Sequence, residues 1–174
     1  DAVGEAERMS GYQIDSATIS INGSHILSTH ADGMIAVSSS NHEVNGADLV
    51  RIEEVATLGK IPANREVLEV VPHQYKLDGQ ENIKNPIGMT GTRLELDAHV
   101  VSVLVPHIVN LRKAVEAAKI NAKTTIVSGV AAAMAVLSEQ QLENGVILID
   151  IGGATTNIAI YEEGDLQYTA VLRV

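Results

Sequence analysis

The stretch that decides the fold is VILIDIGGATTNIAIYEEGDLQYTAVLRV, at residues 146–174. In it an apolar run reaches Asp150, two glycines and two threonines follow, and the apolar pattern then resumes. This pattern predicts a β-hairpin with strands at 146–150 and 157–161 around the glycines, and a third strand at 168–172. A turn between two strands excludes the Rossmann and P-loop phosphate sites, because the first runs from its glycines into a helix and the second needs Gly-Lys-Ser/Thr.

The turn at residues 150–156, called the glycine turn below, has the groups that a phosphate site needs. Its glycines allow unusual backbone dihedrals and a close approach to a ligand, and successive N–H groups can converge on phosphate oxygens. Asp150 would repel phosphate unless a cation lies between them, and Mg²⁺ bound through water removes that conflict. The candidate ligands of a metal nucleotide are Asp150, Gly152, Gly153, Ala154, Thr155 and Thr156, with Asp150 as the water-mediated Mg²⁺ contact. The alternative is an ordinary hairpin turn, with Asp and Gly present for conformation.

The composition indicates one globular domain or two small ones. The chain has 174 residues, of which 45% are hydrophobic and only 2% aromatic, so Val, Ile, Leu and Ala must build the core. A formal charge of −10 argues against nucleic acid as a partner. No apolar run is long enough to span a membrane, no secretory signal begins the chain, and the absence of cysteine fits a cytoplasmic protein.

Hydrophobic periodicity predicts alternating strands and helices before the glycine turn. In the first half we expect a helix at 1–11, a strand at 12–21, one or two strands at 25–37 broken at Asp32-Gly33, and an amphipathic helix at 46–58. A strand at 67–75 should have an edge or a bulge at Pro72, followed by a loop at 78–91 and a strand at 92–104. Beyond these we expect a helix from Pro106 that buries Ile108, Leu111, Ala114, Val115 and Ala118, a short buried strand at 124–127 and a small helix at 131–137.

Several stretches resemble known proteins. The glycine turn is similar to the second phosphate loop of the actin/Hsp70/hexokinase superfamily, whose pattern is Asp-hydrophobic-Gly-Gly-Gly-Thr-Thr-Asp. More of the chain resembles one branch, the FtsA family of bacterial cell-division proteins. The matching stretches are INGSHI at 21–26, VVPHQY at 70–75, DGQENIKNPIGM at 78–89, GTRLE at 91–95 and the strands of 145–174. The resemblance covers nearly the whole chain in the expected order, and GQENIKNPIGM is highly specific to that branch.

The resemblance implies an α/β segment of an actin-like (ribonuclease H-like) fold, with an inserted α+β subdomain, 1C, of the SHS2 type. Residues 1–23 would be the end of the first part of subdomain 1A, residues 24–101 subdomain 1C, residues 102–142 the return of 1A, and residues 143–174 the start of 2A with the second phosphate loop. The first phosphate hairpin, the rest of 2A, subdomain 2B, the adenosine-binding segment and a C-terminal amphipathic helix would lie outside this chain.

The function implied by the resemblance is that of an ATP- and Mg²⁺-binding filament protein of bacterial septation. It would lie at the cytoplasmic face of the inner membrane and link the FtsZ ring to it, through regions absent here. Subdomain 1C would serve head-to-tail self-association and contact later division proteins, around Pro72 and residues 78–91; the alternative is a loop that merely closes the insertion. No catalytic residue is assigned. The full-length protein would be at most a weak ATPase, and we expect the isolated chain to be inactive and to bind ATP weakly or not at all.

Two positions depart from the superfamily pattern. Ala154 replaces the third glycine, and its Cβ would restrict positive φ and crowd a phosphate. Asn157 replaces the usual Asp and removes one negative charge near the metal. Two other protein classes stay open: a small-molecule kinase of the same superfamily, and an actin-like pilus-assembly or rod-shape protein. The FtsA-like insertion stretch argues against a kinase. A rod-shape protein should lack the insertion at 24–101, and a pilus-assembly protein should lack the stretch at 78–95.

Other polar residues suggest weaker sites. His25 and His30 should lie on opposite strand faces, and His73, His99 and His107 lack the spacing of metal ligands. Ser128-Gly129 should cap a helix, with an anion site as the alternative. Two sets of charged residues should lie at the surface: Glu53 and Glu54 on a solvated helix face, and Lys84 and Arg93, either paired with Glu81 or Glu95 or in contact with a neighbouring subunit.

Overall fold

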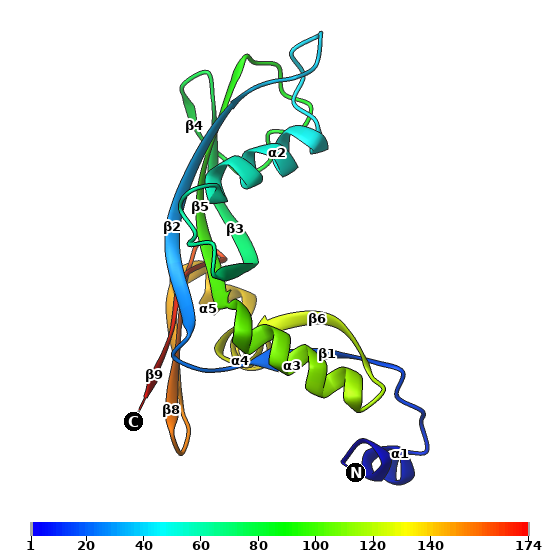
Figure 1. The fold of residues 1–174 in the computed structure, drawn as a ribbon. Helices are drawn as coiled ribbons and strands as arrows, with labels where there is room; N and C mark the ends of the chain where they lie inside the picture. The colour runs from blue at the N-terminus through cyan, green and yellow to red at the C-terminus, as the bar shows by residue number, and fades with distance from the viewer. Residues whose placement is uncertain (1, 174) are drawn as a thin grey trace.

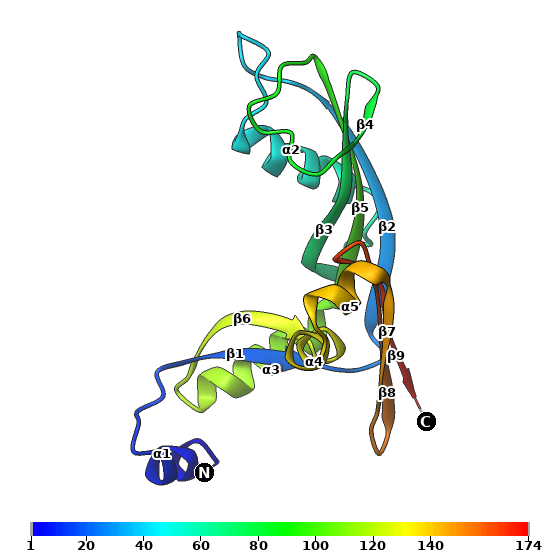
Figure 2. The same cartoon turned by 180° about the vertical axis from the view of Figure 1, so that it is seen from behind.

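The computed structural model describes residues 2–173, which form three β-sheets and five helices. The molecule is elongated, with a four-stranded sheet at one end and helix α1 (Ala2–Ser10) at the other (Figure 1). Seen from behind, the two smaller sheets lie between these ends (Figure 2). Helix α1 buries none of its residues, so it adds nothing to the core. No helix in residues 2–173 has the length and apolarity needed to cross a bilayer.

The four-stranded unit consists of β2 (Ile26–Ala36), α2 (Gly46–Thr57), β3 (Arg65–Leu77), β4 (Gln80–Ile83) and β5 (Arg93–Leu104). Its sheet is antiparallel in the order β2-β5-β3-β4, and α2 covers one face (Figure 1). Strand β5 alternates in sequence, so every second side chain of its first half points at α2. The core on that face includes Ala31, Ile52, Ala56, Leu94, Leu96, Ala98 and Val100.

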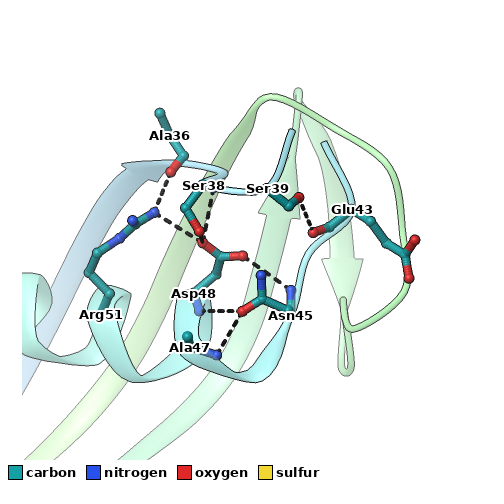
Figure 3. Close-up of polar contacts among 8 residues, drawn as sticks. All are labelled: Ala36, Ser38, Ser39, Glu43, Asn45, Ala47, Asp48 and Arg51. Atoms are coloured by element: carbon teal, nitrogen blue, oxygen red, sulfur yellow. Dashed lines mark hydrogen bonds and ion pairs between the residues drawn. The ribbon is translucent and has the colours of Figure 1, made fainter. Parts of the chain in front are cut away.

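Helix α2 begins at a capping box. Asn45 Oδ1 accepts from the N–H groups of Ala47 and Asp48 at 2.9 and 3.3 Å, and Asp48 Oδ2 accepts from the N–H of Asn45 at 3.1 Å. Asp48 is fully buried, and its Oδ1 also accepts from the Ser38 hydroxyl at 2.8 Å and from Arg51 at 3.0 Å (Figure 3). Burial raises the pKa of Asp48, but these hydrogen bonds outweigh it and lower the pKa below its ordinary value.

The second sheet pairs β1 (Ser16–Ile21) in parallel with β6 (Asn121–Val127). Between these strands the chain runs through the whole four-stranded unit and then α3 (Val105–Ala117). Pro106 lies at the start of α3, where its missing N–H costs no hydrogen bond. Helix α4 (Ser128–Val136) follows β6 directly.

The terminal sheet is an antiparallel meander of β7 (Val146–Ile151), β8 (Thr155–Glu162) and β9 (Asp165–Arg173), preceded by α5 (Glu139–Asn144). The β8–β9 turn has Glu163 and Gly164 at φ of 53° and 81°, the left-handed pair that a tight hairpin needs. The N–H groups of these two residues donate to the carbonyls of Glu143 and Leu142, both at 3.2 Å. The turn therefore satisfies free carbonyls at the end of α5.

A second core joins the four-stranded unit to the rest of the molecule. It includes Ile26 of β2 together with Val101 and Val103 of β5, and it extends to side chains from β1, α3, β6, α4, β8 and β9. The start of β2 and the end of β5, which α2 does not cover, thus pack against the terminal sheet. The opposite face of the terminal sheet is open: Ile147, Ile149 and Ile151 are 59%, 59% and 76% exposed.

Several expected elements are confirmed. The hairpin around the glycines, the third strand, the helix at 46–58, the strand at 92–104 and the helix from Pro106 are all present. Helix α1 matches the helix expected at 1–11, of which Asp1 lies outside the described residues. The expected irregularity at Pro72 is a register shift between Pro72 and Gln74 against β5.

The structure corrects the expected strands at four places. Strand β1 begins only at Ser16, where its partner β6 begins. The segment at 25–37 is not broken at Asp32-Gly33, because Gly33 lies in register opposite Leu96 of β5. The expected loop at 78–91 contains β4, which pairs with the end of β3. The strand expected to be buried at 124–127 is mostly not: in β6 only Val127 is buried.

The helices after β5 also differ from expectation. In α3 only Ile108 is buried, while Ala114 and Ala118 on the face expected to be buried are exposed. Helix α4 begins three residues before the expected Ala131, and α5 was not expected at all. Its signal was present, since Ser138 and Gln141 form a capping box.

Candidate functional site

The glycine turn lies at the end of the β7–β8 hairpin, beside the end of β1. The Asn22 side chain, directly after β1, donates from Nδ2 to Thr155 Oγ1 at 3.1 Å across 133 residues. Asp150, Gly152, Gly153 and Ala154 are exposed, whereas Thr155 and Thr156 are half-buried. The structure therefore brings the six predicted ligands to one solvent-accessible turn.

The conformation of the turn differs from expectation. Neither glycine, nor Ala154, has a φ in the left-handed region, so the turn does not use the unusual dihedrals that its glycines allow. Ala154 fits this backbone without strain for the same reason. Space favours Gly152 instead, because a Cβ there would lie 3.1 Å from Thr155 O, a tight contact that the turn would have to relax by a few tenths of an ångström. The Gly152 N–H donates to that carbonyl at 2.9 Å, so it is not free to bind a phosphate as drawn.

Asp150 and Asn157 lie opposite each other in the β7–β8 ladder. Asn157 Nδ2 donates to Asp150 Oδ2 at 3.0 Å, which orients the carboxylate. Asn157 is only 3% exposed, and its Oδ1 has no hydrogen-bond partner among the described residues. A buried acceptor without a donor is costly, so this oxygen is suited to a water or ligand that can donate.

The start of α4 packs against the same place. A Cβ on Gly129 would lie 3.2 Å from Asn157 Cβ, so glycine favours this close approach of α4 to β8. Ser128 Oγ donates to Ile21 O at 3.2 Å, at the end of β1. The expected helix cap at Ser128-Gly129 was wrong, because the cap position is Val127 and no side chain caps α4. Ser128 instead ties α4 to β1.

One feature of the turn suits a hydrated cation, and another suits an anion. Asp150 offers an exposed carboxylate held by Asn157, the arrangement that a water-mediated Mg²⁺ contact needs. Gly153 has nothing within 4 Å of the position of a Cβ, so a ligand can approach its backbone freely. Within residues 2–173 no three His, Asp or Glu side chains are placed to hold a metal directly.

The weaker candidates lie elsewhere in the fold. Arg93 pairs with Glu95 at 2.8 Å, one of the two acidic partners considered. Lys84 pairs with neither, because it reaches Asp165 of β9 at 2.7 Å while Glu81 pairs with Lys76. Glu53 is half-buried rather than solvated, and this burial raises its pKa.

Four of the six histidines stack in two pairs that their spacing did not predict. His25 stacks on His107 with ring centroids 3.9 Å apart, and His73 stacks on His99 at 6.2 Å. Each pair joins segments far apart in the chain, so no local pattern could have revealed either.

Comparison with known proteins gives the family. A family model described as the SHS2 domain inserted in FTSA matches residues 23–102, which include nearly all of the four-stranded unit. The cell division protein FtsA of Pseudomonas aeruginosa is 40% identical over 173 residues, 99% of this chain and 41% of that protein. The chain belongs to the FtsA family. FtsA of Bacillus subtilis and FtsA of Escherichia coli are 35% and 34% identical over 171 residues, 98% of this chain in each case.

Family membership explains the architecture of this chain, but the chain corresponds to only part of its relatives. The chain spans about two fifths of the length of the curated FtsA relatives it matches, 41%, 39% and 40% in these three. The mixed α/β fold with an SHS2 domain is that of an actin-like segment carrying the FtsA insertion. The boundaries of the other expected subdomains stay predictions, as does the role of the glycine turn.

Sequence reasoning missed two residues of the candidate site. Asn22 was not among the predicted ligands, yet its side chain donates to Thr155. Asn157 was considered only because it lacks the charge of an aspartate. That its Oδ1 is buried without a hydrogen-bond partner follows from the packing of the folded chain, in which Gly129 of α4 lies against Asn157. The Asn22-Gly23 dipeptide is typical of a turn, but nothing in it indicates a contact with the β7–β8 hairpin.

Proposed function

We propose that this chain is the part of an actin-like cell-division protein that carries the second phosphate loop and the SHS2 insertion. The observation behind the proposal is the juxtaposition of Asp150, the exposed glycine turn and Asn22 at the end of β1, in a chain of the FtsA family. The relatives are named cell division proteins, and a role in division is the function we carry over to this chain.

The cofactor that we propose is ATP with Mg²⁺. The N–H groups of Gly153 and Ala154 and the hydroxyls of Thr155 and Thr156 would hold the phosphate tail, and Asp150 would hold Mg²⁺ through water. The metal would neutralise the phosphate charge that otherwise opposes Asp150. The orphaned Asn157 Oδ1 supports this proposal, since a metal-bound water can donate to it. The Gly152 N–H joins the site only if its bond to Thr155 O opens.

The remaining roles belong to the whole protein. We propose that it forms head-to-tail filaments, links the FtsZ ring to the inner membrane at the septum and recruits later division proteins through the SHS2 domain. Binding of FtsZ and of the membrane would use parts of the protein outside this chain. Such a filament needs a heterologous contact, in which two different surfaces of the same protein meet.

A chimera tests both the role in division and the nucleotide site. The matching 173-residue segment of P. aeruginosa FtsA would be replaced by this chain, and the chimera expressed in cells depleted of their own FtsA. We expect rescued septation and septal localisation, and loss of both with Asp150→Ala. Glu139→Gln, an exposed change in α5, is the control and should rescue fully. Full rescue by the Asp150→Ala chimera would contradict the nucleotide site, and failure of the unmodified chimera would contradict the division role.

The isolated chain should bind ATP weakly. Its turn is exposed and closes no cavity of its own, so few contacts would compensate the lost translational freedom of the ligand. Calorimetry with Mg²⁺–ATP should give a dissociation constant of about 1 mM or weaker. Micromolar affinity would show that this chain alone forms a complete site.

A further inference from the structure

Two histidines hold β9 against the four-stranded unit. His73 Nε2 lies 3.1 Å from Leu166 O, and because a carbonyl only accepts, this nitrogen carries the proton and donates. His99 acts through Ser28, since its Nε2 contacts Ser28 Oγ and that hydroxyl accepts from the Thr169 N–H at 3.0 Å. These five residues are the histidine seam below.

The seam lies at the polar end of the contact between the four-stranded unit and the terminal sheet, which is otherwise apolar. On one side of the seam, Ile26, Val101 and Val103 pack into the core shared with the terminal sheet. On its other side, at His73, lies a hollow of about 540 Å³ whose lining residues are all polar. Water therefore has access to the side of the seam at His73, while the side at the apolar core is closed.

The neutral form of His99 suits this arrangement. Ser28 Oγ already accepts from Thr169, so its own proton is free to be donated to an unprotonated His99 Nε2. In charged histidine both ring nitrogens are donors. Ser28 would then accept two hydrogen bonds, and its hydroxyl proton would lose its acceptor in a site where His99 is only 4% exposed.

We propose that the histidine seam is an acid-sensitive latch, which holds β9 on the four-stranded unit while His99 is neutral and releases residues 166–169 when it is protonated. Leu166 leaves the second core when the latch opens, while the contacts among Ile26, Val101 and Val103 stay closed, so the opening is local. This inference does not depend on the nucleotide site, because no residue of the seam belongs to the glycine turn.

The charges around the seam favour opening in acid. The groups that face His99 are His73 from β3 and His30 from β2, both cationic when protonated, and β9 presents only Thr169 and backbone. Burial, followed by these two histidines, lowers the pKa of His99 to about 4. Carboxylates lie further out, where His30 approaches Asp97 at 3.4 Å. The other charged residues lining the hollow are Lys84, Glu162, Glu163 and Asp165.

The size of the effect follows from proton linkage. In the open latch His99 is exposed and titrates near its ordinary value of about 6.5. The closed state binds its proton only near pH 4. Between these values the closed-to-open ratio should fall by up to about tenfold per pH unit as the pH falls, because opening takes up one proton.

The Thr169 amide reports directly on the latch, because it donates to the side chain of Ser28 in β2. Hydrogen exchange of the whole chain would be followed by NMR from pH 7.5 to pH 5, with rates corrected for intrinsic exchange. We expect the protection of Thr169 to fall by about tenfold per unit below pH 6.5, while β9 amides bonded to β8 keep theirs. Constant protection of Thr169 over this range would overturn the proposal.

Two variants separate titration from packing. His99→Gln keeps a polar side chain that does not titrate, and its Thr169 protection should not vary with pH. His42→Gln, at an exposed turn of the four-stranded unit, should behave as the unmodified chain. The same pH dependence in His99→Gln as in the unmodified chain would contradict the latch. If His99→Gln does not fold, NMR titration of the His99 ring in the unmodified chain decides: a pKa well below 6.5 supports the latch, and an ordinary one overturns it.

Discussion

Lys84 Nζ lies 2.7 Å from Asp165 Oδ2, although 81 residues separate them in the chain. Lys84 follows β4 in the four-stranded unit, and Asp165 begins β9 in the terminal sheet. The hydrogen bond to Asp165 raises the pKa of Lys84, with a further contribution from the charge of Glu163 at 3.9 Å. The stretch most specific to the FtsA family, residues 79–89, thus contacts the hairpin that follows the glycine turn.

This ion pair should contribute little to stability. Lys84 is 56% exposed and Asp165 28%, so water and salt screen the attraction. In a double-mutant cycle of Lys84→Met and Asp165→Asn, urea unfolding should give a coupling free energy of about 0.5 kcal/mol that falls further at high salt. A coupling above about 2 kcal/mol would mean that the pair is a major part of the contact between the two units.

The Asp48 network should be far more important for stability. Asp48→Asn loses the charge-assisted bonds from Ser38, Asn45 and Arg51 in a fully buried site, at a cost of about 2 kcal/mol in the free energy of unfolding. Because the pKa of Asp48 is lowered by folding, its stabilisation is present above the unfolded value of about 3.9 and is lost as pH falls through the lower folded value. Chemical denaturation at pH 7 and pH 3 checks both.

Glu43→Gln, an exposed neighbour, is the control and should cost less than about 0.5 kcal/mol. Equal stability of Asp48→Asn and the unmodified chain at pH 7 would contradict the network.

Replacement by alanine should destabilise the chain at one glycine and have almost no effect on its stability at another. A Cβ on Gly33 would lie 2.9 Å from Ile52 O, so α2 must move away from β2, and we expect a loss of about 2 kcal/mol. Gly153 has open space around its Cβ position and no left-handed φ, so Gly153→Ala should change stability by less than about 0.5 kcal/mol. Thermal unfolding of both variants compares them directly. A stable Gly33→Ala would show that α2 does not pack against β2 as described.

The open face of the terminal sheet should make the isolated chain associate. Ile147, Ile149 and Ile151 form an exposed apolar row on β7, and such patches promote aggregation. Ile149→Lys should lower the light scattering of concentrated samples while leaving the melting temperature within a few degrees. Glu139→Gln on α5, outside this face, changes the net charge by the same +1 and should have a smaller effect. Equal scattering by both variants would mean that net charge, not the isoleucine row, controls association.

Restoring the superfamily aspartate at position 157 tests the proposed metal. Asn157 Nδ2 lies 3.0 Å from Asp150 Oδ2, so Asn157→Asp places two carboxylates in contact in a partly buried site. Without a cation the repulsion should cost about 2 kcal/mol at pH 7 and raise the pKa of one carboxyl. Millimolar Mg²⁺ should recover much of this loss in the variant and have little effect on the unmodified chain. Recovery by Na⁺ at equal ionic strength would indicate screening alone and contradict a Mg²⁺ site.

The local structure could be predicted largely from sequence because its rules act over a few residues. The alternation of apolar residues marked β5, the glycines marked the β7–β8 hairpin, and Pro106 marked the start of α3. The errors came where a distant partner decided the outcome. Gly33 was taken as a strand break, yet β2 continues through it under α2. Ser128 was taken as a helix cap, yet it bonds to Ile21.

The sequence by itself determined most of the strands and helices, the family and the six candidate ligands, because periodicity and motif residues lie within short stretches of chain. Only the tertiary structure decided that Asn22 meets Thr155, that Asn157 keeps a buried oxygen without a partner, and that His99 lies between two sheets. Each of these depends on which surfaces pack together once the cores form. Packing couples residues across more than seventy positions, and no pattern along the chain specifies which side chains will then be close.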